Sequence, residues 1–581
     1  MGLSAHVDCI VSLLFAPIMI WLVVGGVDDL VLNLFWLRLW FRPKEPVPNI
    51  YGEPEKLLAI FVPLWQEHEV VRQMVTHNVT SLRYSRYHIF VGGYPNDTPT
   101  LEAIREMEEQ FPHLHLSLVP HDGPTSKADC LNWAYQTMLL YEEQTGLRFD
   151  GVVTHDAEDI IHPDSLRWIS CYLTQFDMVQ VPVLALRTPV WELVHGIYID
   201  EFSESQSRDF QVREALGGFL PGSGVGTGLS RAGLEALAAS AANRIFEPSC
   251  LTEDYENGFR VKALGLRQTF LPIRFIDGIP IATREYFPRT WKSAVKQRTR
   301  WSTGISWQGW ERHGWDGGWR QWWWHWRDRK GMIGNPIGVV CNLLFVYAVV
   351  WPERAAALLR DEPTAALLPF TVGMAVLQAG LRMGMVGRSY GWRMAVAVPL
   401  RIPLANWINT SAGVRAGWRF VRSKAGWEPL VWLKTQHQYP NRFALEAHRP
   451  TLSEVLVKSG YLEEAALEGK PAGRRLQDWL VESGRLSEGD LYEALSLQLS
   501  LPVCPVALES LSREVVRALP AHIVRQHQVV PIRVEGGDLV LAVPEAPPET
   551  LSLSLQPYTR LNVKFELVLR STFERILGEH L

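Results

Sequence analysis

Hydrophobic residues in this chain gather in a few long uncharged runs, separated by segments where short apolar runs alternate with amphipathic ones. Three runs contain no charged residue: 9–27, 331–351 and 363–381. A helix needs about 20 apolar residues to cross a bilayer core of ~30 Å, so we expect three membrane spans. The alternative for each is a buried core helix. The first run lacks a basic leader and a small-residue cleavage site, which predicts an anchor rather than a cleaved signal peptide.

Two further apolar stretches are less regular. The stretch 30–40 carries one arginine, and we expect it to lie in the membrane interface or to complete a hairpin with the first span. The stretch 394–414 carries Arg401 between two prolines. Because an arginine is costly in lipid, we interpret this stretch as interfacial or re-entrant. If it crossed the membrane, the C-terminal domain would lie outside.

Basic residues beside the runs predict the orientation, since lysine and arginine favour the cytoplasmic side. They follow the first run, precede the second and follow the third: Arg38, Arg42, Lys44, Arg320, Arg327, Arg329, Lys330, Arg382, Arg388 and Arg393. We therefore expect residues 42–330 in the cytoplasm and the loop 352–362 on the opposite side.

Between the first two spans, the pattern is that of an α/β domain. Short apolar runs at 57–63, 88–94 and 152–156 predict buried strands, and helical patterns separate them. This alternation predicts a parallel sheet, which binds its ligands at the carboxyl ends of the strands. Polar residues follow each run there.

Composition changes the picture in three ways. A net charge of -5 does not indicate a nucleic-acid-binding protein. The six cysteines are isolated and form no C-x-x-C pair, which would indicate zinc or redox chemistry. The 24 tryptophans are dense between Trp291 and Trp326. We expect most of that tract to form interfacial helices, and stacking on a sugar is the other use of such residues.

Asp156, Glu158 and Asp159 follow the third predicted strand. A divalent cation held by one or two carboxylates can neutralise a diphosphate, so this cluster predicts a Mg²⁺ or Mn²⁺ site. Asp156 and Glu158 are the expected ligands, and Asp159 is the alternative to Glu158. The competing interpretation is a helix cap.

Thr252-Glu253-Asp254 is followed at a distance by Gln297-Arg298-Thr299-Arg300-Trp301. This pair of motifs resembles the membrane family 2 glycosyltransferases, the cellulose- and hyaluronan-synthase-like group. The resemblance implies a GT-A-like fold and an inverting transfer from a nucleotide sugar, with Asp254 as general base. It also implies a diphosphate and acceptor site that includes Glu253, Gln297, Arg298, Arg300, Trp301, Gly222 and Ser223. Helical periodicity places Gln297, Arg300 and Trp301 on one face, with Arg298 off it.

The same resemblance implies the donor contacts. Lys127, in Ser126–Asn132, would meet the diphosphate, unless it is an ordinary solvated lysine. Asp97 would contact the base or ribose, and Glu67 would lie near the uracil of a UDP-sugar. The glycine-dense run 217–228 would line the acceptor site, against the alternative of a linker.

An internal repeat marks a soluble C-terminal domain, because Leu452–Leu462 is echoed by Leu476–Leu486. The repeat resembles the N-terminal domain of type II secretion and pilus ATPases that binds cyclic di-GMP. Arg475 fills the arginine position of the second copy, whereas Thr451 fills that of the first. The alternative is a degenerate docking domain. The implied ligand contacts are Arg475, Leu476, Leu480, Gly484, Leu491, Leu495, Leu452, Leu456 and Gly460.

The predicted fold class is α/β, a GT-A-like domain with transmembrane and interfacial helices plus a small α+β regulatory domain. The expected parts are an anchor (1–48), the glycosyltransferase domain (49–275), interfacial helices (276–330), transmembrane and interfacial helices (331–424), a linker (425–444) and the regulatory domain (445–581). The predicted function is a processive glycosyltransferase of a bacterial inner membrane, extending an exported glycan under cyclic di-GMP control, with its catalytic and C-terminal domains cytoplasmic. A partner for export is expected. The alternatives are a non-catalytic scaffold that senses cyclic di-GMP and a lipid-linked monosaccharide transferase.

Overall fold

The computed structural model describes residues 3–43, 48–276, 278–430, 451–471, 473–499, 501–504, 511–535, 537–548 and 551–580. The chain divides into two units, 1–71 with 83–439 and 72–82 with 440–581. Most of the predicted linker 425–444 lies outside the described residues, so the boundary at 445 stays a prediction. Each unit is described by itself.

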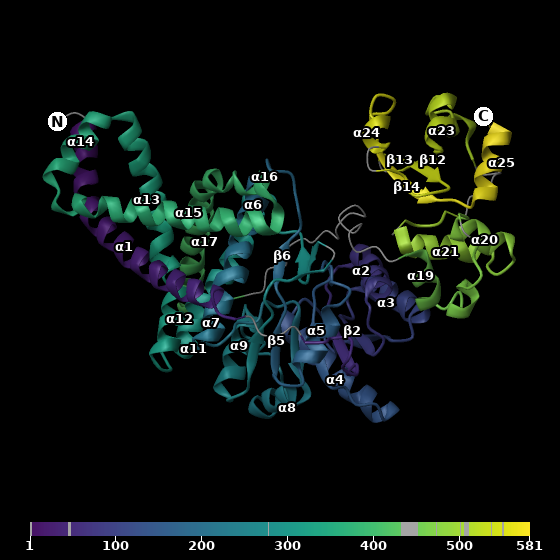
Figure 1. Ribbon diagram of the computed structural model, residues 1–581, viewed down its shortest axis with the longest axis horizontal. Helices are drawn as coiled ribbons and strands as arrows, with labels where there is room; N and C mark the ends of the chain where they lie inside the picture. The colour runs from purple at the N-terminus through teal and green to yellow at the C-terminus, as the bar shows by residue number, and fades with distance from the viewer. Residues whose placement is uncertain are drawn as a thin grey trace. The chain divides into compact units, whose positions relative to one another are not determined.

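A mixed seven-stranded sheet forms the centre of the first unit, in the order β3-β2-β1-β4-β7-β5-β8 (Figure 1). The strands are β1 (Leu58–Pro63), β2 (Tyr87–Gly93), β3 (Leu114–Leu118), β4 (Gly151–Thr154), β5 (Met178–Gln180), β7 (Thr227–Ser230) and β8 (Gln268–Phe270). The first four strands are parallel, as the sequence predicts, and β7 runs antiparallel to both β4 and β5. The predicted α/β class is confirmed, but the sheet is not wholly parallel.

Helices follow the strands and cover the sheet. In the first unit they are α3 (Thr98–Gln110), α4 (Lys127–Thr145), α5 (Ser165–Tyr172), α8 (Arg231–Ser240) and α9 (Glu253–Ala263), whereas α2 (His68–Ser81) spans the division between the units. Between α4 and the sheet, Phe61 and Phe149 pack against Leu131 and Met138, all of them buried. Each buried side chain of this size contributes roughly 1.5–3 kcal/mol, so this core fixes the strand ends that carry the polar residues.

Helix α1 (Leu3–Trp40) is continuous through 30–40, so the expected hairpin there is wrong, and the expected place in the membrane interface stays a prediction. Beyond Asp28 the helix packs on the first unit: Leu32 is fully buried, and the Trp36 indole N–H donates to the Ser207 carbonyl at 3.0 Å. One face of this segment therefore packs on protein, whereas Leu34, Leu37 and Trp40 are 58%, 45% and 52% exposed.

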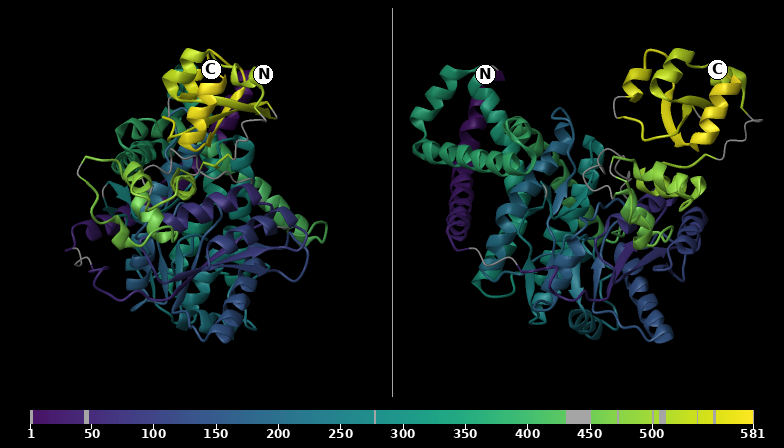
Figure 2. Two further views of the ribbon diagram at one scale, coloured as in Figure 1. Left: turned by 90° about the vertical axis from the view of Figure 1, so that its right-hand side faces the viewer. Right: turned by 45° about the vertical axis from the view of Figure 1, so that its right-hand side comes forward.

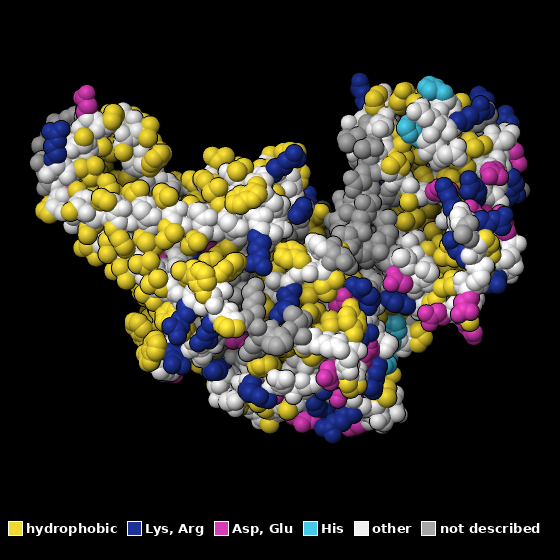
Figure 3. Space-filling model, viewed as in Figure 1, with side chains coloured by type: hydrophobic (Ala, Val, Ile, Leu, Met, Phe, Trp, Pro, Cys, Tyr) yellow, Lys and Arg dark blue, Asp and Glu magenta, His cyan; other side chains and the backbone are white. Residues whose placement is uncertain are grey.

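Three described helical segments are long and apolar enough to cross a membrane: His6–Trp40, Gly331–Val350 and Pro363–Tyr390. They correspond to α1, α13 (Gly331–Val350), and η3 (Pro363–Leu367) with α15 (Leu368–Tyr390), and α14 (Pro352–Asp361) joins the last two. Figures 1 and 2 show α1 running beside the other two. Hydrophobic side chains cover these helices on the face shown in Figure 3. The predicted spans are confirmed as candidates, the third extending further toward the C-terminus.

Helix α17 (Val398–Lys424) includes most of the stretch expected to be interfacial or re-entrant, and it is not among the candidate spans. Its Arg401 is fully buried and binds the Asp200 carboxylate of α6 (Leu193–Glu204) with two hydrogen bonds of 2.6 and 2.7 Å. The arginine is therefore paired inside protein, which removes the cost that it would have in lipid.

The tryptophan-dense tract forms α10 (Trp291–Ser302), the π-helix η2 (Thr303–Gln308), α11 (Gly309–His313) and α12 (Trp319–Arg329). Gly304 allows this run to approach the site, because an added Cβ there would lie 2.3 Å from the Thr252 hydroxyl. Shorter elements complete the unit: β6 (Val183–Ala185), η1 (Ser205–Asp209), α7 (Phe210–Ala215), β9 (Phe275–Ile276), β10 (Ile279–Pro280), β11 (Thr283–Glu285) and α16 (Trp392–Ala395).

The second unit combines a helical part with a three-stranded sheet. Its elements are α19 (Leu452–Lys458), η5 (Glu464–Leu467), α20 (Leu476–Glu482), α21 (Glu488–Leu499), α22 (Arg513–Val516), α23 (Ala521–His527), β12 (Val530–Glu535), β13 (Asp538–Val543), α24 (Leu551–Leu555), β14 (Asn562–Leu567) and α25 (Arg570–His580). The two repeats share one geometry. Gly460 and Gly484 both end their helices with positive φ, 75° and 68°. The repeat is therefore structural, and the predicted α+β class holds.

Candidate active site

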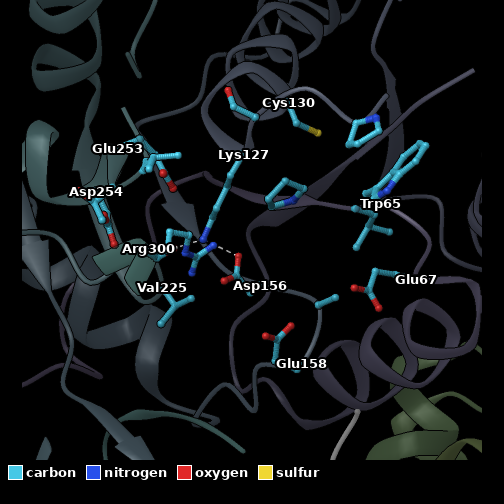
Figure 4. Close-up of a pocket in the computed structure, with 18 of the residues that line it drawn as sticks. Trp65, Glu67, Lys127, Cys130, Asp156, Glu158, Val225, Glu253, Asp254 and Arg300 are labelled. Carbon is cyan, nitrogen blue, oxygen red and sulfur yellow. Dashed lines mark hydrogen bonds and ion pairs between the residues drawn. The ribbon is translucent and has the colours of Figure 1, made fainter. Parts of the chain in front are cut away.

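One cavity, partly open to solvent, receives residues from every region in which the sequence predicts donor chemistry. The loop after β1, the start of α4, the loop after β4, the glycine run, the start of α9 and one face of α10 all reach it (Figure 4). The predicted residues that line it are Glu67, Lys127, Asp156, Glu158, Ser223, Glu253, Asp254, Gln297, Arg300 and Trp301.

Lys127 extends across the cavity to Asp156, and its ammonium lies 2.6 Å from the Asp156 carboxylate (Figure 4). Ser126 caps the start of α4 by accepting from the Asp129 N–H, which places Lys127 in the first turn. Burial lowers the pKa of Lys127, but the Asp156 and Glu253 carboxylates more than offset this and the net shift is upward. The Lys127 side chain is only 13% exposed and is paired with a carboxylate, so its interpretation as a solvated surface lysine is wrong.

Glu253 and Asp254 begin α9 and face the same cavity from the opposite side. Desolvation and the neighbouring Asp254 charge raise the pKa of Glu253 to about 7. Desolvation also raises the pKa of Asp254, against the opposing effect of Lys127. One Asp254 oxygen accepts from the Tyr255 N–H at 2.8 Å. Both carboxylates thus hold a proton more strongly than they would in water, a property suited to a general base.

The glycine run is a shaped loop that fits between Lys127 and Asp254. Gly224 has φ +79°, and a Cβ there would lie 2.9 Å from the Asp254 carboxylate and 3.3 Å from the Lys127 ammonium. The Lys127 ammonium donates to the Gly224 carbonyl at 3.2 Å. Gln180 fixes the loop by accepting from the Ser223 N–H at 2.9 Å. These contacts disfavour the linker alternative.

Gly222 lies outside the cavity lining, and its role differs from that of Gly224. Its N–H donates to the Asp254 carbonyl at 3.2 Å, and an added Cβ would lie 2.8 Å from that oxygen. Gly222 therefore packs the loop against the backbone of α9, where the resemblance implied an acceptor contact.

The other end of the cavity is aromatic, and the sequence did not predict its residues. Trp65 and Tyr94 meet edge to face at 5.4 Å, and Pro124 and Cys130 line the same end. Burial raises the pKa of Cys130 to about 12, so this thiol behaves as an apolar group. Glu285 also enters the cavity from β11. The only sequence signal for Trp65 and Tyr94 is their place just after a predicted strand.

The acidic cluster after β4 divides between the cavity and the protein interior. Asp156 and Glu158 line the cavity, whereas Asp159 is fully buried and contacts His155 at 2.8 Å. Among the residues that the structure describes, no three His, Cys, Asp or Glu side chains could hold a metal by themselves. Two carboxylates fit a Mg²⁺ or Mn²⁺ ion whose remaining ligands are phosphate oxygens and water. Of the two alternatives, Glu158 is the better placed.

Besides Gly222, two predicted residues do not reach the cavity. Asp97 is 5% exposed, and its carboxylate accepts from the Gln66 N–H at 2.5 Å, so it holds the loop of Glu67 instead of contacting a base or ribose. Arg298 lies on the opposite face of α10, where its guanidinium binds Glu201 at 2.7 Å. Its position off the face of Arg300 is as predicted, but its place among diphosphate ligands is not supported by the geometry.

In the second unit, Arg475 lines a cavity of ≈ 1150 Å³ with Arg570, and Glu545 contacts both arginines at 2.9 and 3.4 Å. Leu491 and Leu495 also line it. Leu456 and Leu480 are fully buried, so they support the helices from inside the core and present no surface to a ligand. The remaining predicted contacts, Leu452, Leu476, Gly460 and Gly484, lie outside the cavity lining.

Two family models match parts of the chain. The family model "Glycosyltransferase like family 2" matches residues 54–304, and the MshEN domain model matches residues 499–581. Among solved structures, a mannosyltransferase from Pyrobaculum calidifontis in complex with GDP-Man and Mn²⁺ is 17% identical with a TM-score of 0.44, covering 69% of this chain and 99% of that one. A structure of MshE with cdg is 28% identical with a TM-score of 0.21, covering 23% of this chain and 100% of that one.

Two curated relatives match nearly the whole chain. Bacteriophage adsorption protein B of Escherichia coli K12 is 31% identical over 586 residues, which cover 94% of this chain and 78% of that protein. Bacteriophage N4 adsorption protein B of Escherichia coli O157:H7 matches to the same extent. The chain therefore belongs to the bacteriophage adsorption protein B family and is a family 2 glycosyltransferase joined to an MshEN domain.

Proposed function

We propose that this protein is a processive, inverting glycosyltransferase of a bacterial inner membrane that extends an exported glycan under cyclic di-GMP control. One observation carries the proposal. Lys127, Asp156, Glu158, Asp254 and Arg300, which come from four separate segments of the sequence, line one cavity. A non-catalytic scaffold has no use for this juxtaposition.

In the proposed reaction, the Asp254 carboxylate takes the proton of the acceptor hydroxyl as that oxygen attacks the anomeric carbon. Attack occurs from the face opposite the diphosphate, so the configuration inverts. Lys127 and Arg300 stabilise the charge on the departing diphosphate. Asp156 and Glu158 would hold Mg²⁺ or Mn²⁺, which when bound supplies further charge neutralisation to the diphosphate.

The two ends of the cavity support a nucleotide sugar as donor. A base fits the aromatic end, where it can stack on Trp65 or Tyr94 and lie near Glu67, and the diphosphate fits the end that carries Lys127. We assign a UDP-sugar on the resemblance to the polysaccharide synthases.

The acceptor is assigned to the part of the cavity lined by Trp301. The centres of the Trp301 and Tyr198 rings lie 6.0 Å apart. A ring held in this way offers one edge or face to a terminal sugar. Processive extension is the favoured mode, and a lipid-linked monosaccharide transferase is the alternative that product size separates from it. A partner in the periplasm or outer membrane would receive the exported glycan.

Contacts between the candidate spans support the proposed orientation. Near one end, Lys330, just before α13, binds Asp28 of α1 at 2.6 Å. Near the other, Tyr347 of α13 donates to Asp8 at 2.7 Å, and Ser12 donates to Glu362 at 2.8 Å. The three helices therefore alternate in direction. With the basic ends inside, the catalytic unit and the second unit are cytoplasmic.

Cyclic di-GMP is assigned to the second unit. Its cavity contains Arg475 and Arg570 beside the apolar Leu491 and Leu495, a combination that suits guanine stacking and phosphate pairing. In the first repeat, the position that corresponds to Arg475 holds Thr451, which caps helix α19. Only the second repeat would therefore bind cyclic di-GMP through an arginine.

The test is transfer of radiolabelled sugar by membranes that contain the protein, against a panel of nucleotide sugars, with and without cyclic di-GMP. The proposal expects a long product from one donor and a change in rate on adding cyclic di-GMP. A short lipid-soluble product would support the alternative. No incorporation from any donor, with protein of normal thermal stability, would support the scaffold.

A further inference from the structure

Arg298 sits inside the Gln297–Trp301 motif but faces away from the cavity. It is 6% exposed, and its guanidinium donates to the Glu201 carboxylate at 2.7 Å and to the Asn409 side-chain carbonyl at 2.6 Å. The Asn409 amide donates in turn to Glu201 at 3.2 Å. These three side chains come from α10, α6 and α17, so they form a closed polar ring that joins three helices.

The ring is one part of a larger pattern on α6. Asp200, Glu201 and Glu204 of α6 each bind an arginine from a different helix. Asp200 binds Arg401 of α17, Glu201 binds Arg298 of α10, and Glu204 binds Arg382 of α15 at 2.6 Å. Only the middle pair touches the helix that carries Gln297, Arg300 and Trp301.

The Arg298 guanidinium also makes a cation–π contact, since its central carbon lies 4.3 Å from the centre of the Tyr198 ring. The planar group is therefore fixed in both orientation and distance. Because Arg298 and Arg300 are two residues apart on one helix, fixing the first sets the direction in which the second projects. A rotation or slide of α10 would move Gln297, Arg300 and Trp301 together.

We propose that Arg298, with Glu201 and Asn409, is a positioning residue that holds α10 in register so that Arg300 meets the diphosphate. This proposal rests on the proposed transferase function. Arg298 contacts no substrate; it acts through Arg300. The arginine inside the motif thus serves the helix packing, and the α6 carboxylates link the catalytic helix to the membrane helices.

The test measures kcat and KM for sugar transfer in Arg298→Met, Glu201→Gln and Asn409→Ala. We expect kcat to fall on the order of 10- to 100-fold in the first two, because a displacement of about 1 Å at a remote support can cost this much. Nucleoside diphosphate affinity should fall to the same extent in these two variants, because both act through Arg300. The double variant Arg298→Met/Glu201→Gln should be no slower than the slower single variant, since both break the same ring.

The matched control is Asp200→Asn/Arg401→Met, which breaks a neighbouring buried pair on α6 without touching α10. Its kcat should stay within about 2-fold of wild type. Thermal unfolding shows which variants are folded. If Arg298→Met does not fold, Asn409→Ala replaces it in the comparison, because this change leaves the Arg298–Glu201 ion pair intact.

Three results would overturn the inference. Arg298→Met could weaken nucleotide affinity while Glu201→Gln leaves activity unchanged, which would make Arg298 a direct ligand. The effects of the two changes could multiply in the double variant, or the control could lose as much activity as the ring variants. If the wild-type protein transfers no sugar, the proposed function fails instead.

Discussion

Lys127 and Asp156 are joined by a 2.6 Å ion pair across the cavity, although they follow different strands of the sheet. The pair places a cation beside one of the two carboxylates assigned to the metal. A diphosphate and its metal would compete for both partners, so the lysine can pass from the carboxylate to the phosphate without leaving the cavity. In their absence, the ion pair keeps the Asp156 charge compensated.

Replacing Lys127 by Met should weaken the binding of a nucleoside diphosphate about 10- to 100-fold, the usual effect of losing a charge-assisted hydrogen bond of about 1.5–3 kcal/mol. Isothermal titration with UDP and Mg²⁺ measures this. Lys262→Met, an exposed residue of α9 outside this cavity, is the matched control and should bind normally. Equal affinities in the two variants would remove Lys127 from the diphosphate site.

The pH profile of kcat/KM should show an acid limb set by Glu253 and Asp254. Desolvation and the Asp254 charge raise the pKa of Glu253 to about 7, and desolvation raises that of Asp254. The base must be ionised, so activity is lost as the pH falls through the pair's apparent pKa and is present above it. Glu253→Gln removes a neighbouring negative charge and should shift the limb to lower pH. An unshifted limb would show that the pair does not control the reaction.

Gly224→Ala should reduce transfer sharply, because the new methyl would meet the Asp254 carboxylate at 2.9 Å. The positive φ adds a strain of about 1–2 kcal/mol. Gly265→Ala separates the two effects, since Gly265 has φ +74° and nothing within 4 Å of its added Cβ. Both variants should lose similar thermal stability, and only Gly224→Ala should lose activity. Comparable activities would show that the loop is not part of the site.

Arg475→Ala should abolish the response to cyclic di-GMP and leave the basal transfer rate unchanged. Titration of the full-length protein with cyclic di-GMP measures binding, and the transfer assay measures the response. Arg517→Ala removes an exposed arginine outside this cavity and is the control for net charge. Normal binding by Arg475→Ala would remove Arg475 from the cyclic di-GMP site, whereas no binding by the wild-type protein would favour the degenerate docking domain.

Residues that follow predicted strands were the easiest to place from sequence, because the ends of adjacent parallel strands meet at one edge of a sheet. Helical periodicity likewise placed Gln297, Arg300 and Trp301 on one face and Arg298 off it. Both rules depend only on local geometry. They placed Glu67, Asp156 and Arg300 at the cavity, but the strand rule failed for Asp97, which holds a loop instead.

Features that depend on tertiary packing were missed. Nothing local distinguishes a continuous α1 from a hairpin, because residues 30–40 are apolar whether they meet lipid or the buried face of the first unit. From the sequence alone, Arg401 is a charged residue that interrupts an apolar stretch. Its partner Asp200 is 201 residues away in sequence, so the ion pair could not be predicted locally. The aromatic end of the cavity was missed for the same reason, since Trp65 and Tyr94 meet only in the folded sheet.

The most direct test compares nucleotide binding and sugar transfer in Asp254→Asn. Loss of a general base should lower kcat about 10²- to 10⁴-fold, while UDP and Mg²⁺ still bind because Lys127, Asp156 and Glu158 are intact. An Asp254→Asn protein that transfers sugar at the wild-type rate would contradict the account, since no proton acceptor in the cavity would then be required at that position.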